Sequence, residues 1–204
     1  YHFCSNSRNF SNNKDLVEET IDNLNIMLDT KIEKINYSLE NISENIFKEA
    51  KRLLPNNNYI GFSITQGNRY RQKSWPIQNF IELAKKIRAK NKVPVFFVEK
   101  SYDSLITKIK SEVPNALFPE HKSIIPSPAL VTALSTRLDK AISIDNGVMH
   151  MIALANIKMI VLFGPTNAKK FAPKMKNVRV LDSKNIYKND DISKIIVSDV
   201  FKYI

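Results

Sequence analysis

The chain has 204 residues, of which 43% are hydrophobic and 25% charged, with 31 Lys and Arg against 20 Asp and Glu, a net charge of +11. This is the composition of a soluble globular protein, and its basic excess favours anionic partners such as nucleotides, nucleic acid or a phosphate-rich membrane surface. The single cysteine, Cys4, excludes an intramolecular disulfide, and no metal site is expected because no Cys/His cluster has zinc spacing.

Residues 1–58 are expected to be largely helical and to have no sheet of their own. Apolar residues at helical spacing predict one helix over 16–28, with Asp15 as its cap. They predict a second helix that begins at Ser43 and ends before Pro55. Because two helices cannot bury their apolar faces alone, we interpret this stretch as the tail of a preceding domain plus a linker.

From Tyr59 onward, strand and helix patterns alternate. Continuous apolar runs, which are typical of strands buried on both faces, are separated by amphipathic segments. Strands are predicted at 59–65, 93–99, 141–145, 159–164 and 178–181, and helices at 77–90, 102–113, 128–138, 147–156 and 191–204. This alternation predicts a doubly wound α/β domain with a parallel sheet over residues 59–204.

Three loops of the predicted domain are chemically distinctive. They follow strands, and ligands of open parallel sheets bind beyond the carboxyl ends of the strands. The chain's four glycines all lie in or next to these loops: Gly61, Gly67, Gly147 and Gly164. In a chain so poor in glycine, this placement indicates tight turns or close approach of the backbone to a ligand. Turn chemistry alone would give the same placement.

The first loop, TQGNRYRQKSWP, carries Arg69, Arg71 and Lys73 just before a helix whose first turn suits Pro76. Cationic side chains and free backbone N–H groups at a helix N-terminus favour an anion. The alternative is a solvated basic loop. Trp75, the only tryptophan, is interpreted as a packing anchor.

The second loop lies within AISIDNGVMHMIALA, where an acid, an amide, a glycine and a histidine gather at the start of a helix. Asp145 alone could cap that helix through the N–H of Gly147 or Val148, and His150 alone could be a buried core residue. Together they favour a polar site for a phosphate or a sugar. Asp145, His150 and Lys158 interrupt the strongly apolar stretches here, so we expect no transmembrane helix.

The third loop, LFGPTNAKKFAPK, follows a predicted buried strand. Gly164 and Pro165 predict a sharp turn, Thr166 and Asn167 offer hydrogen-bonding groups, and two lysines add positive charge. Gly-Pro is a generic turn sequence, so the position of this loop at the binding edge is more informative than its residues.

In this order, the three loops resemble the glycosyltransferase family 9 heptosyltransferases: KSWP before an amphipathic helix, then SIDNGVMHMIALA, then VLFGPTN. The resemblance covers residues 59–182 and implies a GT-B glycosyltransferase. Residues 59–204 would be its C-terminal, Rossmann-like domain, which binds the nucleotide-sugar donor. Residues 1–58 would be the end of its N-terminal acceptor domain and a linker.

The same resemblance implies a reaction and a location. The enzyme would transfer heptose from ADP-heptose to the lipopolysaccharide inner core, with inversion and with neither a metal nor another cofactor. Its acceptor partner would be lipid A–Kdo or lipopolysaccharide core at the inner membrane surface. The protein would be cytoplasmic, peripheral to that membrane, and would bind no nucleic acid.

Individual residues acquire expected roles from the resemblance. Lys73 would neutralise the leaving diphosphate, and Asp145 would bind hydroxyl groups of the donor. The catalytic base belongs to the family's N-terminal domain, so we expect this chain to bind the donor and transfer no sugar. The same donor pocket would be lined by Asn146, Gly147, Val148, His150 and Thr166, and by either Glu99 or Asp103.

Two other functions fit parts of the sequence. The net charge of +11 fits a basic nucleic-acid- or nucleotide-binding module without transferase activity. No nucleic-acid motif is present, however, and Phe96, Phe97 and Phe163 lie in predicted buried strands and not on a stacking face. Another α/β nucleotide-sugar enzyme, such as an epimerase, is disfavoured because no G-x-G-x-x-G turn follows the first strand.

Overall fold

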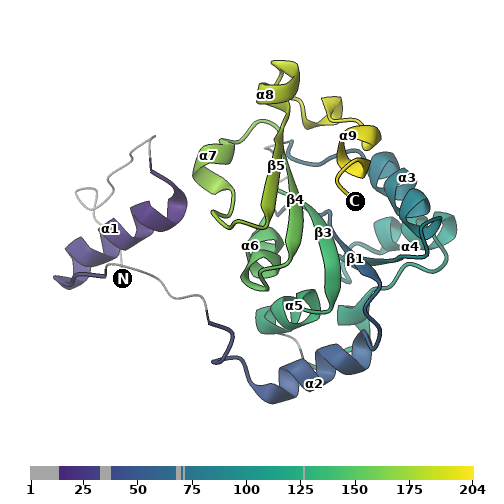
Figure 1. Ribbon diagram of the computed structural model, residues 1–204, viewed down its shortest axis with the longest axis horizontal. Helices are drawn as coiled ribbons and strands as arrows, with labels where there is room; N and C mark the ends of the chain where they lie inside the picture. The colour runs from purple at the N-terminus through teal and green to yellow at the C-terminus, as the bar shows by residue number, and fades with distance from the viewer. Residues whose placement is uncertain (1–13, 33–37, 68–69, 71, 126) are drawn as a thin grey trace.

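The computed structural model describes residues 14–32, 38–67, 70, 72–125 and 127–204. Its centre is a five-stranded, wholly parallel sheet with the strand order β2-β1-β3-β4-β5 (Figure 1). The strands are β1 (Tyr59–Ser63), β2 (Val93–Phe97), β3 (Leu138–Ile144), β4 (Lys158–Phe163) and β5 (Val178–Asp182). The predicted parallel α/β sheet is confirmed. Three residues named above, Cys4, Arg69 and Arg71, lie outside the described ranges.

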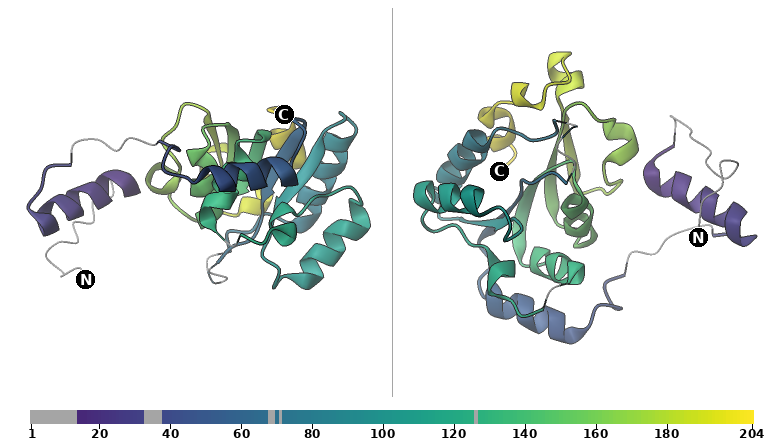
Figure 2. Two further views of the ribbon diagram at one scale, coloured as in Figure 1. Left: turned by 90° about the horizontal axis from the view of Figure 1, so that it is seen from below. Right: turned by 180° about the vertical axis from the view of Figure 1, so that it is seen from behind.

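Helices cover both faces of this sheet (Figures 1 and 2). One face packs against α3 (Ile77–Arg88), α4 (Asp103–Glu112) and α9 (Val197–Phe201). The other packs against α2 (Glu44–Leu53), α5 (Pro128–Ser135), α6 (Gly147–Leu154) and α7 (Ala168–Phe171). The remaining elements are α1 (Leu16–Leu28), α8 (Ser183–Tyr187) and the 3-10 turns η3 (Pro119–Lys122) and η4 (Ile192–Lys194).

Strands β1 and β2 and the later parts of β3 and β4 are largely apolar because successive side chains enter two different cores. In β3, Ile142 joins the core beneath α3 and α9, whereas Ala141 joins the core beneath α5 and α6. The first core includes Phe62 stacked on Phe96, with ring centroids 4.8 Å apart. Burial on both faces fixes the strand register, so the loops at the carboxyl edge emerge at defined positions.

Both helices predicted within residues 1–58 are present. Asp15 caps α1, and its side chain accepts hydrogen bonds from the Val17 and Glu18 N–H groups. Helix α2 packs against α5, and its Ala50 and the following residue, Leu54, are completely buried. The packed unit around the sheet thus includes a helix that precedes the predicted boundary at residue 59.

Helix α1 lies beside α7 in both ribbon figures (Figures 1 and 2). There the Lys170 ammonium and the buried Glu19 carboxylate form an ion pair of 2.7 Å. This contact joins the N-terminal part of the chain to the loop that follows β4.

The predicted helix over 128–138 was too long. Helix α5 ends at Ser135, and β3 already begins at Leu138. The side chain of Arg137 holds this turn against the connection between α2 and β1, because its guanidinium donates hydrogen bonds to the carbonyls of Leu54, Pro55 and Asn56. The strand therefore starts three residues earlier than its apolar run predicted.

The predicted helix over 191–204 was wrong as a single element. The structure has η4, then extended backbone at Ile195 and Ile196, and then the short helix α9. Ile195 is fully buried, and its carbonyl accepts a 2.7 Å hydrogen bond from the Trp75 indole N–H. This contact interrupts the helix and confirms Trp75 as a packing anchor, since the tryptophan is only 2% exposed. Helices α7 and α8 were not predicted.

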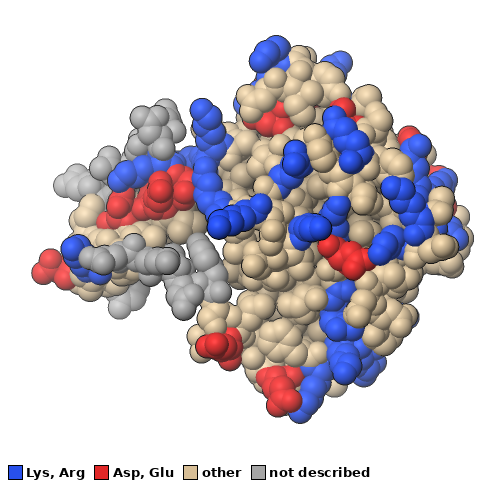
Figure 3. All heavy atoms as spheres, in the orientation of Figure 1, with Lys and Arg blue, Asp and Glu red and all other residues tan. Residues whose placement is uncertain are grey.

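The surface is basic without forming one continuous stripe on the face that Figure 3 shows. There, Lys and Arg side chains are spread among uncharged atoms, with fewer Asp and Glu. None of the helices in the described ranges is both long enough and apolar enough to cross a membrane.

Candidate functional site

The candidate site lies at the carboxyl edge of the three central strands. The first loop follows β1, the second joins β3 to α6, and the third follows β4. Because β3 lies between β1 and β4 in the sheet, the three loops are neighbours in space. The predicted convergence of these loops is therefore present in the structure.

Lys73 and Asp145 form a largely buried ion pair at this edge. The Lys73 Nζ lies 2.9 Å from Asp145 Oδ2, and the two side chains are 13% and 10% exposed. The Gln66 side chain accepts a 2.7 Å hydrogen bond from the Lys73 backbone N–H, which fixes the loop on the other side. An ammonium group has three hydrogens, so the bond to Asp145 leaves the others available for a ligand.

Asn146, and not Asp145, caps the helix that follows. Its Oδ1 accepts a 2.8 Å hydrogen bond from the Met149 N–H. Its Nδ2 donates bonds of 2.8 Å to the Ser63 hydroxyl and to the Thr65 carbonyl. The interpretation of Asp145 as a mere helix cap is wrong, because the Asn146 side chain caps α6 and Asp145 pairs with Lys73. Asn146 ties the start of α6 to the end of β1.

Gly147 and Val148 form the first turn of α6. Within the described residues, their N–H groups meet no acceptor, as is usual for the first turn of a helix. A Cβ atom on Gly147 would meet nothing within 4 Å, and its φ is not in the left-handed region. The glycine is therefore not required by its backbone conformation. It leaves open space in front of a helix N-terminus, which favours an anion.

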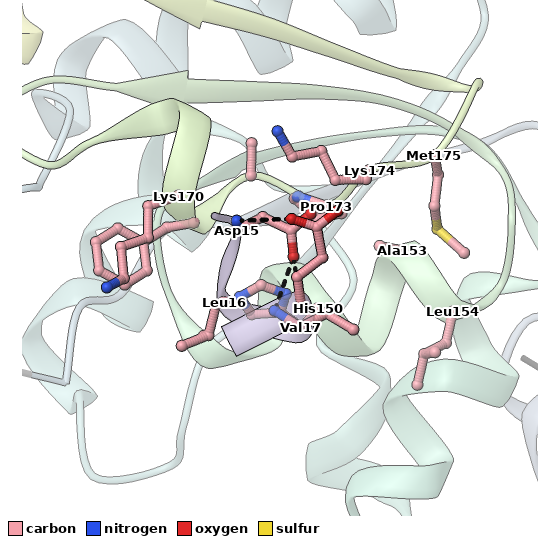
Figure 4. A pocket seen from close by; sticks show the side chains of 13 residues that line it. Asp15, Leu16, Val17, His150, Ala153, Leu154, Lys170, Pro173, Lys174 and Met175 are labelled. Atoms are coloured by element: carbon pink, nitrogen blue, oxygen red, sulfur yellow. Dashed lines mark hydrogen bonds between the residues drawn. The ribbon is translucent and has the colours of Figure 1, made fainter. Parts of the chain in front are cut away.

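His150 lies one turn further along α6 and is exposed, so it is not a core histidine. It lines a cavity of about 300 Å³ between α1, α6 and α7, where it faces the N-terminal end of α1 (Figure 4). Partial desolvation within this cavity lowers the pKa of the otherwise exposed His150 imidazole, and the negative charge of Asp145 acts in the opposite direction. The imidazole is therefore neutral near pH 7 and offers both a donor and an acceptor.

The third loop contributes Thr166, whose hydroxyl oxygen is buried and has no hydrogen-bond partner in the described structure. Gly164 lets another segment pack against this loop. A Cβ atom there would lie 2.7 Å from the Ile192 Cβ and 2.9 Å from the Asp190 carbonyl oxygen. The predicted sharp turn is thus also a point of close packing between distant segments.

Glu99 and Asp103 follow the edge strand β2, which β1 separates from β3, and both residues are exposed. Burial and, secondarily, the charge of Glu99 raise the pKa of Glu120 to about 7. Sequence reasoning missed Glu120 because this carboxylate comes from η3, a separate segment, and no spacing rule connects it with Glu99. Within the described ranges, no group of three or more His, Cys, Asp or Glu residues is placed to hold a metal ion.

Three solved structures of glycosyltransferases share this fold. A family 9 glycosyltransferase from Veillonella parvula DSM 2008 matches with a TM-score of 0.70 and 18% identity, over 90% of this chain and 58% of that one. The ADP-heptose lipopolysaccharide heptosyltransferase II of E. coli matches with a TM-score of 0.63 and 17% identity, over 79% of this chain and 50% of that one. The E. coli heptosyltransferase WaaC with ADP-2-deoxy-2-fluoro heptose matches with a TM-score of 0.65 and 16% identity, over 95% of this chain and 56% of that one.

This chain therefore spans about half the length of these structures. Its parallel sheet, with helices on both faces, is the Rossmann-like C-terminal half of a GT-B glycosyltransferase fold. The sequence profile of glycosyltransferase family 9 (heptosyltransferase) matches residues 9–197, and the chain belongs to that family. The comparison with curated proteins found no match.

Proposed function

We propose that this chain is the donor-binding half of a heptosyltransferase that transfers heptose from ADP-heptose to the lipopolysaccharide inner core, with inversion and without a metal. The observation that carries the proposal is the buried ion pair of Lys73 and Asp145 at the start of α6. It places a fixed cation beside free helix N–H groups, and this combination matches a diphosphate.

In the proposed reaction, Lys73 and the first turn of α6 bind the diphosphate of the donor. The diphosphate gains negative charge as its bond to the sugar breaks. A cation already held in place stabilises that charge more in the transition state than in the ground state. The Asp145 carboxylate keeps Lys73 in position, and its second oxygen is suited to accept a hydrogen bond from a donor hydroxyl.

The acceptor hydroxyl loses a proton as it attacks the anomeric carbon. The family resemblance assigns the base for this step to the N-terminal domain. We therefore expect the 204-residue chain to bind the donor and to transfer no sugar to a lipid A–Kdo acceptor. The names of the two E. coli relatives, which include ADP-heptose and a fluorinated ADP-heptose, support the choice of donor.

Calorimetry with ADP tests the donor site. The wild-type chain should bind ADP with an affinity that falls as salt rises, because salt screens the attraction between the free diphosphate and this basic chain. Lys73→Met should remove this binding. Lys92→Met is the matched control, because Lys92 forms an exposed ion pair with Asp139 at the opposite edge of the sheet. A folded protein that binds unrelated oligonucleotides but not ADP would overturn the proposal in favour of a basic nucleic-acid-binding module.

A further inference from the structure

A positively charged hollow lies at the amino-terminal edge of the sheet, at the opposite end of the strands from the Lys73–Asp145 pair. This amino-edge hollow has a volume of about 580 Å³ and lies at the starts of the neighbouring strands β3, β4 and β5. Several Lys and Arg side chains lie around the place where Figure 1 marks the C-terminus (Figure 3). The described residues that line the hollow include no carboxylate and four cations: Lys140, Lys158, Lys176 and Arg179.

The strand register places three of these cations side by side. Lys140 and Lys158 are direct partners in the pairing of β3 with β4, and Arg179 lies on β5, the next strand. Side chains two residues apart in a strand point to the same face of the sheet. Two residues after each cation comes a side chain of the core beneath α3 and α9: Ile142, Ile160 and Leu181. The three cations therefore continue one face of the sheet beyond its apolar part.

Tyr203 holds two of the cations in place. Its backbone carbonyl accepts a hydrogen bond from the Lys140 ammonium. Its ring lies against the Arg179 guanidinium, with 4.2 Å between the ring centroid and Cζ. Such a stacked contact orients the guanidinium and leaves its N–H groups able to donate to a ligand. Because both cations are held before a ligand arrives, less conformational freedom is lost on binding.

The clustering of these charges works against folding. Within the described ranges, none of the four cations forms an ion pair. Burial lowers the pKa of Lys140, and the positive charges of Lys158 and Lys90 lower it further. Like charges on paired strands, which lie about 4.8 Å apart, repel each other. An anion that neutralises these charges explains the arrangement better than fold stability does.

The kind and number of charged groups match a compact phosphate-class anion. A guanidinium binds phosphate oxygens through two parallel hydrogen bonds, and an ammonium binds them as a point charge. Four cations in one hollow match closely spaced negative charges, such as those of a diphosphate. The volume of the hollow lies within the range of about 300–1,000 Å³ that small-molecule sites occupy.

An anionic membrane fits the amino-edge hollow less well than a small anion does. The hollow and the Lys73–Asp145 pair lie at opposite ends of the same strands. A membrane docked at the amino edge would therefore face away from the edge at which a lipid-linked acceptor would have to meet the donor. A flat surface would also reach only the rim of a hollow.

We propose that the amino-edge hollow is a second anion site, which binds a compact ligand carrying two or more phosphate-class negative charges. Arg179 and Lys158 contact the phosphate oxygens, and Tyr203 positions Arg179. The inference is independent of the proposed function, because none of the described lining residues belongs to the three loops at the carboxyl edge.

The test is residue-resolved lysine acetylation of the full 204-residue chain, read by mass spectrometry, with inorganic diphosphate as the probe. The diphosphate concentration that protects each lysine measures the affinity of each site separately. Arg179→Gln removes one cation of the hollow and leaves every lysine in place. Lys48→Gln is the matched control, because Lys48 is an exposed residue of α2 and the net charge changes equally. Thermal unfolding shows whether each variant keeps its fold.

Diphosphate should protect Lys158 and Lys176 in the wild-type chain. Arg179→Gln should raise the concentration that protects Lys158 about tenfold, the size expected for one charge-assisted contact. Protection of Lys73 should stay within about twofold, and Lys48→Gln should leave both sites within about twofold. Protection of Lys73 without protection of Lys158 would overturn the inference. Equal weakening by Arg179→Gln and Lys48→Gln would also overturn it, because it would show a diffuse effect of net charge.

Two further outcomes concern other ligands and the donor site. Protection of Lys158 by vesicles of phosphatidylglycerol, or by a single-stranded oligonucleotide, but not by diphosphate would assign the hollow to a membrane or to nucleic acid and reject the inference. Protection of Lys158 without protection of Lys73 would support the second anion site while counting against the proposed donor site.

Discussion

Lys73 Nζ donates a 2.9 Å hydrogen bond to Asp145 Oδ2 across 72 residues of sequence. The contact joins the loop after β1 to the end of β3 in a largely dry environment. A buried ion pair adds little net stability, because the loss of hydration offsets most of the attraction. Such a pair is therefore better explained by the need to hold a cation at a fixed place than by the need to stabilise the fold.

Lys73→Met should both destabilise the protein and remove ADP binding. The substitution leaves Asp145 buried without its cation, which should lower the free energy of unfolding by about 3–5 kcal/mol. Adding Asp145→Asn removes the unpaired charge and should restore most of that stability, as measured by urea denaturation. The double variant should still fail to bind ADP in calorimetry. Recovery of ADP binding would show that Lys73 only compensates Asp145 and does not contact phosphate.

Gly147→Ala should keep the fold and weaken ADP binding. The added Cβ meets no protein atom within 4 Å, so packing is not disturbed. Alanine favours a helix over glycine by up to about 1 kcal/mol, and the thermal midpoint should therefore be equal or higher. The methyl group projects into the space in front of the helix N-terminus, and ADP affinity should fall about tenfold, a loss of about 1.4 kcal/mol.

Gly67→Ala serves as the control for Gly147→Ala, because a Cβ atom at Gly67 also meets nothing within 4 Å. Its ADP affinity should match that of the wild type. If Gly147→Ala also binds ADP normally, the phosphate does not approach the first turn of α6.

Gly164→Ala should behave in the opposite way from Gly147→Ala. Its Cβ would lie 2.7–2.9 Å from atoms of Asp190 and Ile192, and two of these three atoms belong to the backbone. Overpacking of this kind should cost about 1–3 kcal/mol of stability. The loss should appear as a thermal midpoint several degrees below that of the wild type. A wild-type thermal midpoint would show that the segment can move away freely.

The stability of the protein should depend on Glu120 between pH 4.5 and 7. The pKa of this carboxyl is about 7 in the folded protein, against a usual 4.5. Between these values the folded state holds a proton that the unfolded state has lost, so stability decreases as pH rises through this interval. Glu120→Gln removes this effect. The variant should unfold at a higher temperature than the wild type at pH 8, and the difference should vanish near pH 4.

Glu112→Gln is the corresponding control for Glu120→Gln. The hydrogen bond from Lys85 lowers the pKa of Glu112, so its removal should not raise stability at pH 8. Equal thermal midpoints of Glu120→Gln and the wild type at pH 8 would contradict the assignment of a buried, protonatable Glu120.

The sheet could be predicted from the sequence because burial on both faces makes its strands read as continuous apolar runs. Helix ends were harder to predict when they depend on distant residues. The helix predicted over 191–204 is interrupted by the Trp75 indole, and α5 ends where Arg137 turns toward the segment before β1. Periodicity within either segment contains no information about these partners.

The candidate site was predicted as a set of residues but not as an arrangement. Asp145 and Asn146 are both residue types that can cap a helix. Only the structure shows that Asp145 pairs with Lys73 while Asn146 caps α6. The sequence identified Gly164 as a turn residue. Its close contact with Ile192 depends on a segment that follows β5, so this contact could not be predicted.

During synthesis, Trp75 and Gly164 leave the ribosome before Ile195, the residue whose segment both of them hold. The sheet can assemble as soon as β5 has emerged, because each of its strands precedes that segment. The segment 190–195, which contacts Gly164 and Trp75, can be added only afterwards. A nascent chain can therefore have a complete sheet, and the Lys73–Asp145 pair, before the segment 190–195 packs onto Gly164 and Trp75.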